Sequence, residues 1–131
     1  MLIYLIDDDV ISLYLAEQVL ELADFAEDIR LFSTAESALN SLVEHLPTQL
    51  PQVIFLDLNM PHMDGWDFLQ ALEPHAAALQ GRCLIYILTS SLALADTARA
   101  KDFPLVAGVL YKPLDEQDLQ AITARLRDAI E

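Results

Sequence analysis

The chain has 131 residues, 54% of them hydrophobic and 21% charged, and a formal net charge of -14. This length predicts a single domain, residues 1–131, with no output domain, and the apolar content is enough for a core. Direct binding to nucleic acid or insertion into a membrane is not expected, because the lysines and arginines number only 7 and no apolar run is long enough to span a bilayer. The lone cysteine, Cys83, excludes an intrachain disulfide, and the lack of a signal-peptide pattern predicts a cytoplasmic location.

Short apolar runs alternate along the chain with longer segments whose apolar residues recur at helical spacing. The strands predicted in chain order are residues 1–6, 29–32, 53–56, 84–88 and 106–110. Helices are predicted at about 10–23, 34–45 and 66–79, over about ten residues ending near 102, and after residue 115. Five βα units with strands this apolar predict an α/β fold in which helices cover both faces of a parallel sheet.

Polar residues mark the predicted helix starts, and a proline interrupts one helix. The predicted caps are Asp9 for the first helix, Ser33 with Glu36 as a capping box for the second, Ser90 or Ser91 for the fourth, and Asp115 for the last. Pro74 is expected to kink or shorten the third helix. Trp66 and Phe68 are expected to pack that helix against the sheet or its neighbours.

Ligands of parallel α/β sheets bind beyond the carboxyl ends of the strands. The side chains that follow the predicted strands there include Asp7, Asp8, Asp57, Thr89 and Lys112. If the first and third strands are neighbours, their carboxylates converge, and their mutual repulsion calls for a counter-charge. Oxygen ligands without a nearby His or Cys favour Mg²⁺ or Mn²⁺. A carboxylate in such a site could attack phosphorus, with Lys112 and Thr89 stabilising the transferred group.

Four segments together resemble the receiver domain of bacterial two-component response regulators, in the same order and spacing over essentially the whole chain. These segments are residues 5–9, 53–65, 87–90 and 111–113. The resemblance implies a CheY-like, doubly wound sheet of five parallel strands in the order 2-1-3-4-5, as in flavodoxin. It also implies a stand-alone signalling domain that catalyses only its own phosphorylation and dephosphorylation.

The resemblance implies a role for each residue of the strand-end site. Asp57 would be the phosphoacceptor, Asp8 the principal ligand of Mg²⁺, Asp7 the second member of an acidic pair, Asn59 the donor of a backbone carbonyl to the metal, Thr89 a hydroxyl donor to the phosphoryl group, and Lys112 its ion-pair partner. The side chains of Asn59 and Ser91 match positions that tune loss of the phosphate. Met60, Pro61 and Gly65 would shape the adjacent loop, and Pro113 follows a peptide bond that is commonly cis in the family.

Two positions depart from the family pattern. The aromatic residue that usually lies three positions before the lysine is replaced by Val109, and Tyr111 lies next to the lysine instead. Ser90 stands where Ala or Gly usually follows the threonine. Phosphorylation is expected to survive both changes, whereas the usual coupling between the hydroxyl and a rotating aromatic ring is in doubt.

The expected phosphodonor is a histidine kinase or a histidine phosphotransfer protein, and the downstream protein target is not identified by the sequence. By family analogy, the fourth helix, the fifth strand and the fifth helix would form the partner surface and the interface of a homodimer. A pseudo-receiver that only binds other proteins is the first alternative, and Val109 leaves it open for the switching step. An Asp-nucleophile phosphohydrolase is the second, although Asn59 cannot act as the second acid of such enzymes.

Overall fold

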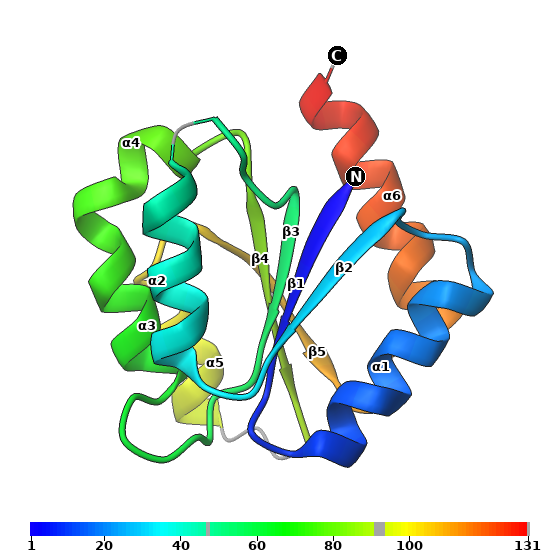
Figure 1. Cartoon of the computed structure of the whole chain (residues 1–131), viewed down its shortest axis with the longest axis horizontal. Helices are drawn as coiled ribbons and strands as arrows, with labels where there is room; N and C mark the ends of the chain where they lie inside the picture. Colours follow the sequence, from blue (N-terminus) through cyan, green and yellow to red (C-terminus); the bar gives the residue numbers. More distant parts are fainter. Residues whose placement is uncertain (47, 91–93, 131) are drawn as a thin grey trace.

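A five-stranded parallel sheet lies between two layers of helices in the computed structural model, which describes residues 1–46, 48–90 and 94–130 (Figure 1). The strands are β1 (Leu2–Ile6), β2 (Asp28–Phe32), β3 (Val53–Leu56), β4 (Leu84–Thr89) and β5 (Val106–Tyr111). Their order across the sheet is β2-β1-β3-β4-β5. The predicted doubly wound α/β fold and its strand order are confirmed.

The helices divide between the two faces of the sheet. One face carries α1 (Val10–Leu22) and α6 (Glu116–Ile130), and the opposite face carries α2 (Ala35–His45), α3 (Gly65–Leu72), a 3₁₀ turn (Glu73–His75), α4 (Ala76–Leu79) and α5 (Leu94–Ala100) (Figure 1). Pro74 lies in the 3₁₀ turn that follows α3, as its missing N–H and fixed φ require. Among the described residues, no helix is both long enough and apolar enough to cross a membrane.

Alternate residues of each strand build two separate cores. Tyr4 and Ile6 of β1 contribute to the cluster beneath α2, α3 and α5, whereas Ile3 and Leu5 contribute to the cluster beneath α1 and α6. This alternation follows from the period of two along a strand. Trp66 and Phe68 are buried in the first cluster, as predicted, and Trp66 also stacks on Phe103 with ring centroids 5.7 Å apart.

The helix caps confirm two predictions and correct a third. The Asp9 carboxylate accepts hydrogen bonds from the first turn of α1, and the Asp115 carboxylate accepts one from the Asp118 amide at 2.8 Å. The predicted Ser33–Glu36 box is wrong, because Thr34 is the cap of α2 and its Oγ1 accepts from the Ser37 amide at 3.1 Å. The helix therefore begins at Ala35, which is buried in the core together with Ala38 and Leu42.

The start of α5 falls partly outside the described residues. The helix is described from Leu94 onward, and the predicted cap at Ser91 lies in the segment 91–93, which the structure does not describe. The second predicted role of Ser91, tuning loss of the phosphate, lies outside the described residues for the same reason.

Candidate functional site

The first and third strands are neighbours, and hydrogen bonds continue past their ends. Ile6 of β1 pairs with Leu56 of β3 in parallel register. The next residue of each strand stays in the ladder, since the Asp57 amide donates to the Ile6 carbonyl and the Asp7 amide donates to the Phe32 carbonyl, both at 3.0 Å. The backbone therefore fixes Asp7 and Asp57 side by side at the carboxyl edge of the sheet.

Three carboxylates meet at this edge. Asp7, Asp8 and Asp57 each offer one oxygen, and these oxygens lie within 4.8 Å of one another. Asp7 and Asp57 are 6% and 7% exposed, whereas Asp8 is open to solvent. Two buried carboxylates and an exposed one at this spacing form the acidic cluster predicted from the sequence.

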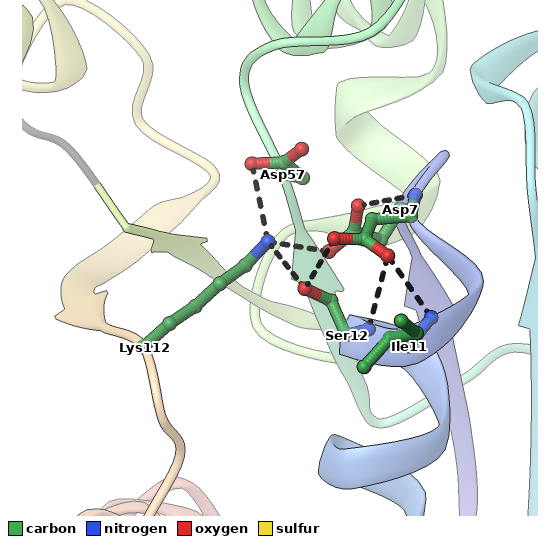
Figure 2. Close-up of polar contacts among 6 residues, drawn as sticks. Asp7, Ile11, Ser12, Asp57 and Lys112 are labelled. Atoms are coloured by element: carbon green, nitrogen blue, oxygen red, sulfur yellow. Dashed lines mark hydrogen bonds and ion pairs between the residues drawn. The ribbon is translucent and has the colours of Figure 1, made fainter.

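Lys112 supplies the positive charge that faces the two buried acids. Its Nζ lies 2.5 Å from Asp7 Oδ2 and 3.8 Å from Asp57 Oδ1, so it bonds Asp7 directly and forms a longer ion pair with Asp57 (Figure 2). Its third neighbour is the hydroxyl of Ser12, at 3.4 Å. One cation therefore serves two buried anions, and it favours Asp7.

The surroundings of Asp57 make its carboxyl hard to ionise. Burial, followed by the negative charge of Asp7, raises the pKa of Asp57 to about 6, although Lys112 acts in the opposite direction. A second positive charge placed among the three carboxylates would relieve the same repulsion. The donor set is all oxygen, which suits a hard divalent cation of the Mg²⁺ type, so the residues present fit such an ion.

The fourth and fifth strands bring Thr89 and Lys112 to the same edge. Thr89 is fully buried at the end of β4, and its carbonyl accepts a hydrogen bond from the Lys112 amide at 2.9 Å. The Lys112–Pro113 peptide bond is cis, as the resemblance implied. The predicted constellation of Asp7, Asp57, Thr89 and Lys112 is thus assembled by four strand ends.

The loop after β3 is held against Asp57 by a glycine. A Cβ at Gly65 would lie 2.7 Å from the Asp57 carbonyl oxygen, closer than packed atoms allow, and the Gly65 amide donates to the Leu58 carbonyl at 3.0 Å. Asp64 and Asp67 form a capping box at this start of α3. Asn59 lies two residues beyond Asp57 with its side chain exposed.

The side chains of Val109 and Tyr111, which concern the first departure from the family pattern, lie in different environments. Val109 is half-buried and packs against the core beneath α2, α3 and α5. Tyr111 is 61% exposed at the end of β5. The aliphatic side chain at position 109 thus occupies the inward site, and the aromatic ring is on the surface.

Sequence reasoning missed Ser12 as a neighbour of the site. Asp9 caps α1, so Ser12 belongs to its first turn, next to the buried Leu13 and one turn before the buried Ala16. A polar residue on the inward side of a first turn that directly follows the acidic strand end is the signal that could have identified it.

Comparisons with known proteins agree with this geometry. The family model for the response regulator receiver domain matches residues 3–124. A two-component response regulator from Cytophaga hutchinsonii is similar in structure, with a TM-score of 0.90, 26% identity, and coverage of 97% of this chain and 96% of that one. A response regulator receiver protein from Dyadobacter fermentans has a TM-score of 0.82, 27% identity, and coverage of 97% and 98%.

No curated protein sequence matches the chain. The family match nevertheless covers β2 to β5, all of β1 except Leu2, and every residue of the strand-end cluster, and the similarity to the two structures extends over nearly their full lengths. On these grounds the chain belongs to the receiver-domain family of two-component response regulators.

Proposed function

We propose that the chain receives a phosphoryl group on Asp57 from a phosphohistidine of a histidine kinase or a phosphotransfer protein, in a reaction that requires Mg²⁺ or Mn²⁺. The observation that carries this proposal is the position of Asp57: a buried carboxylate at a strand end, with two further acids within 4.8 Å and Lys112 Nζ 3.8 Å away. An isolated structural aspartate would have no need for two more carboxylates beside it.

The transfer is a displacement at phosphorus. An oxygen of Asp57 forms the new bond, the bond from phosphorus to the histidine nitrogen breaks, and its electron pair returns to the imidazole ring. Lys112 would then pair with a phosphoryl oxygen, and the Thr89 hydroxyl would donate to another. Asp7, Asp8, Asp57 and the backbone carbonyl of Asn59 would hold the metal ion, whose charge offsets that of the phosphoryl group.

The surface next to the site suits a protein as phosphodonor. Helix α1 begins beside the acidic cluster and exposes large apolar side chains: Val10 and Ile11 at 71% and 70%, and Leu22 at 86%. A groove of about 620 Å³ between α1 and the segment 112–114 continues this apolar face up to Lys112. A donor that must bring its phosphohistidine to Asp57 would cover this face, and we place its contact here.

The output surface would lie around the last strand. β5 is the edge strand of the sheet, with α5 on one face and α6 on the other (Figure 1). This surface would contact the downstream protein and could also form a homodimer. Val109 makes the usual aromatic rotation unsuitable as the coupling step, so the signal to this surface would use another route.

The test is labelling of the purified chain by a small phosphodonor such as acetyl phosphate. Wild type should gain one phosphoryl group only when Mg²⁺ or Mn²⁺ is present, detected by intact mass, and Asp57→Asn should gain none. Asp64→Asn removes a nearby carboxylate of the α3 cap and serves as the matched control that keeps the label. Metal binding without any labelling would instead support a binding module that is not phosphorylated.

A further inference from the structure

Ser12 connects the lysine of the site to the first turn of α1. Its Oγ lies 3.4 Å from Lys112 Nζ (Figure 2). The same oxygen lies 3.3 Å from Oδ2 of Asp9, the residue that caps the helix. The other oxygen of Asp9 accepts from the Ile11 amide at 3.0 Å. Ser12 is half-buried, and its contact with Lys112 is partly shielded from water, whereas its contact with Asp9 is exposed.

The direction of both hydrogen bonds follows from the chemistry of the partners. A lysine ammonium can only donate, and an ionised carboxylate can only accept. The Ser12 hydroxyl must therefore give its one proton to Asp9 and receive a proton from Lys112. Asp9 is in turn held by the amides of the first turn of α1. The Ser12 hydroxyl, which accepts from Lys112, is therefore held in one orientation by its bond to Asp9.

We propose that Ser12 is a positioning residue for Lys112, an inference that rests on the proposed function of the site. Among the described residues, Nζ contacts Asp7 and Asp57, which are charged and belong to the acidic cluster, and Ser12, which is neutral. The hydroxyl does not compete for a cation bound by the acids. It therefore keeps the ammonium beside Asp57 when the charge on Asp7 is shared with a metal.

Removing the hydroxyl should slow phosphoryl acceptance without removing it. Ser12→Ala should reduce the rate of labelling by acetyl phosphate about three- to tenfold, the effect of losing one weak charge-assisted hydrogen bond from the transition state. Ser12→Thr keeps a hydroxyl at the same position and should restore most of the rate. Glu17→Gln changes a half-buried polar residue of the same helix that does not line the groove, and should label at the wild-type rate.

A second measurement examines the contact without any phosphorylation. The chain has two lysines, so protein labelled with ¹⁵N-lysine shows two side-chain ammonium signals. Lys112 should exchange its ammonium protons with water severalfold faster in Ser12→Ala than in wild type or Ser12→Thr. Lys101, which is exposed, should be unchanged and is the internal reference.

The outcomes separate this inference from the proposed function. Wild type that fails to label defeats the proposed function, while the exchange measurement still decides whether Ser12 holds the lysine. Unchanged exchange in Ser12→Ala, or labelling at the wild-type rate, overturns the positioning role. If the alanine and threonine variants are equally slow and equally reduced in melting temperature, Ser12 acts only in folding and the inference is wrong.

Discussion

Asp57 keeps its carboxyl group in a place that disfavours ionisation. The residue is 7% exposed, Asp7 lies beside it, and Lys112 is closer to Asp7 than to Asp57. These causes raise the pKa of Asp57 to about 6, with burial the largest. The same features that suit the residue to bind a cation and accept a phosphoryl group therefore destabilise the metal-free fold.

The destabilisation has a defined pH range. The unfolded chain ionises Asp57 near its ordinary pKa of about 3.9, and the folded chain ionises it near 6. Below about pH 4 the group is protonated in both states and costs nothing. Between about pH 4 and pH 6 the folded state holds the extra proton, so the free energy of unfolding falls as the pH rises.

Asp57→Asn removes this penalty with little change of shape. Without metal, we expect the variant to exceed wild type by on the order of 2 kcal/mol in unfolding free energy at pH 7, and to match it near pH 4. Urea denaturation in the presence of EDTA at both pH values measures the difference. A stabilisation that is equal at both pH values would show that repulsion at Asp57 is not its cause.

Among the elements, α2 shows how far the sequence determines a helix start. Ser33 and Thr34 are both good caps, and the pattern with Glu36 favoured the wrong one. Ala35, Ala38 and Leu42 lie on the buried face of α2 with either start, so the apolar pattern does not choose between the two caps. Adjacent candidates for one cap cannot be separated by local chemistry alone.

The correction at α2 gives a paired prediction. Thr34→Ala should lower the unfolding free energy by about 1 kcal/mol, because the Ser37 amide loses its acceptor at 3.1 Å. Ser33→Ala should change it by only a few tenths of that amount. Thermal denaturation of the two variants measures both changes. A larger loss of stability in Ser33→Ala than in Thr34→Ala would show that Ser33 is the cap after all.

The C-terminal end of α1 carries an unfavourable residue. Asp24 has φ 50, and the amides of Asp24 and Phe25 donate to the carbonyls of Glu21 and Leu20, an arrangement in which glycine is preferred. A negative charge at this end also opposes the helix dipole. Asp24→Gly should raise the unfolding free energy by about 0.5–1 kcal/mol, measured by chemical denaturation. Asp24→Asn removes only the charge. If it raised the unfolding free energy more than Asp24→Gly does, the backbone conformation at residue 24 would not be a source of instability.

At the scale of the whole molecule, the sequence was sufficient for the fold and for most of the site. Strand ends in a parallel sheet share one edge, so Asp7, Asp57, Thr89 and Lys112 could be placed together once the strands were recognised. Ser12 could be recognised as an inward polar residue in the first turn of α1, but its contact with Lys112 could not be predicted. That contact depends on where the packing of α1 on the sheet places this turn relative to the segment after β5, and the chain separates the two residues by 100 positions. Helix packing of this kind is not encoded in any local motif.

Because the chain has a net charge of -14, any added salt stabilises the fold by screening the repulsion between its surface charges. The effect of Mg²⁺ bound at the site must be separated from this general screening. If Mg²⁺ binds a specific site, it should raise the free energy of unfolding more than NaCl does at the same ionic strength. With free Mg²⁺ at a hundred times its dissociation constant, we expect a gain of about 2.7 kcal/mol beyond the NaCl reference. The gain should grow from pH 4 to pH 7, since Asp57 must lose its proton to bind the ion.

Asp8→Asn is the variant that separates site binding from screening. Asp8 is exposed, so its replacement should leave the fold nearly unchanged while removing one of the three carboxylates of the cluster. Both proteins should gain equally from NaCl, and only wild type should gain further from Mg²⁺, as measured by the shift in melting temperature. An equal Mg²⁺ gain in the variant would mean that the ion acts on the overall charge, and that the three acids do not bind it as a group.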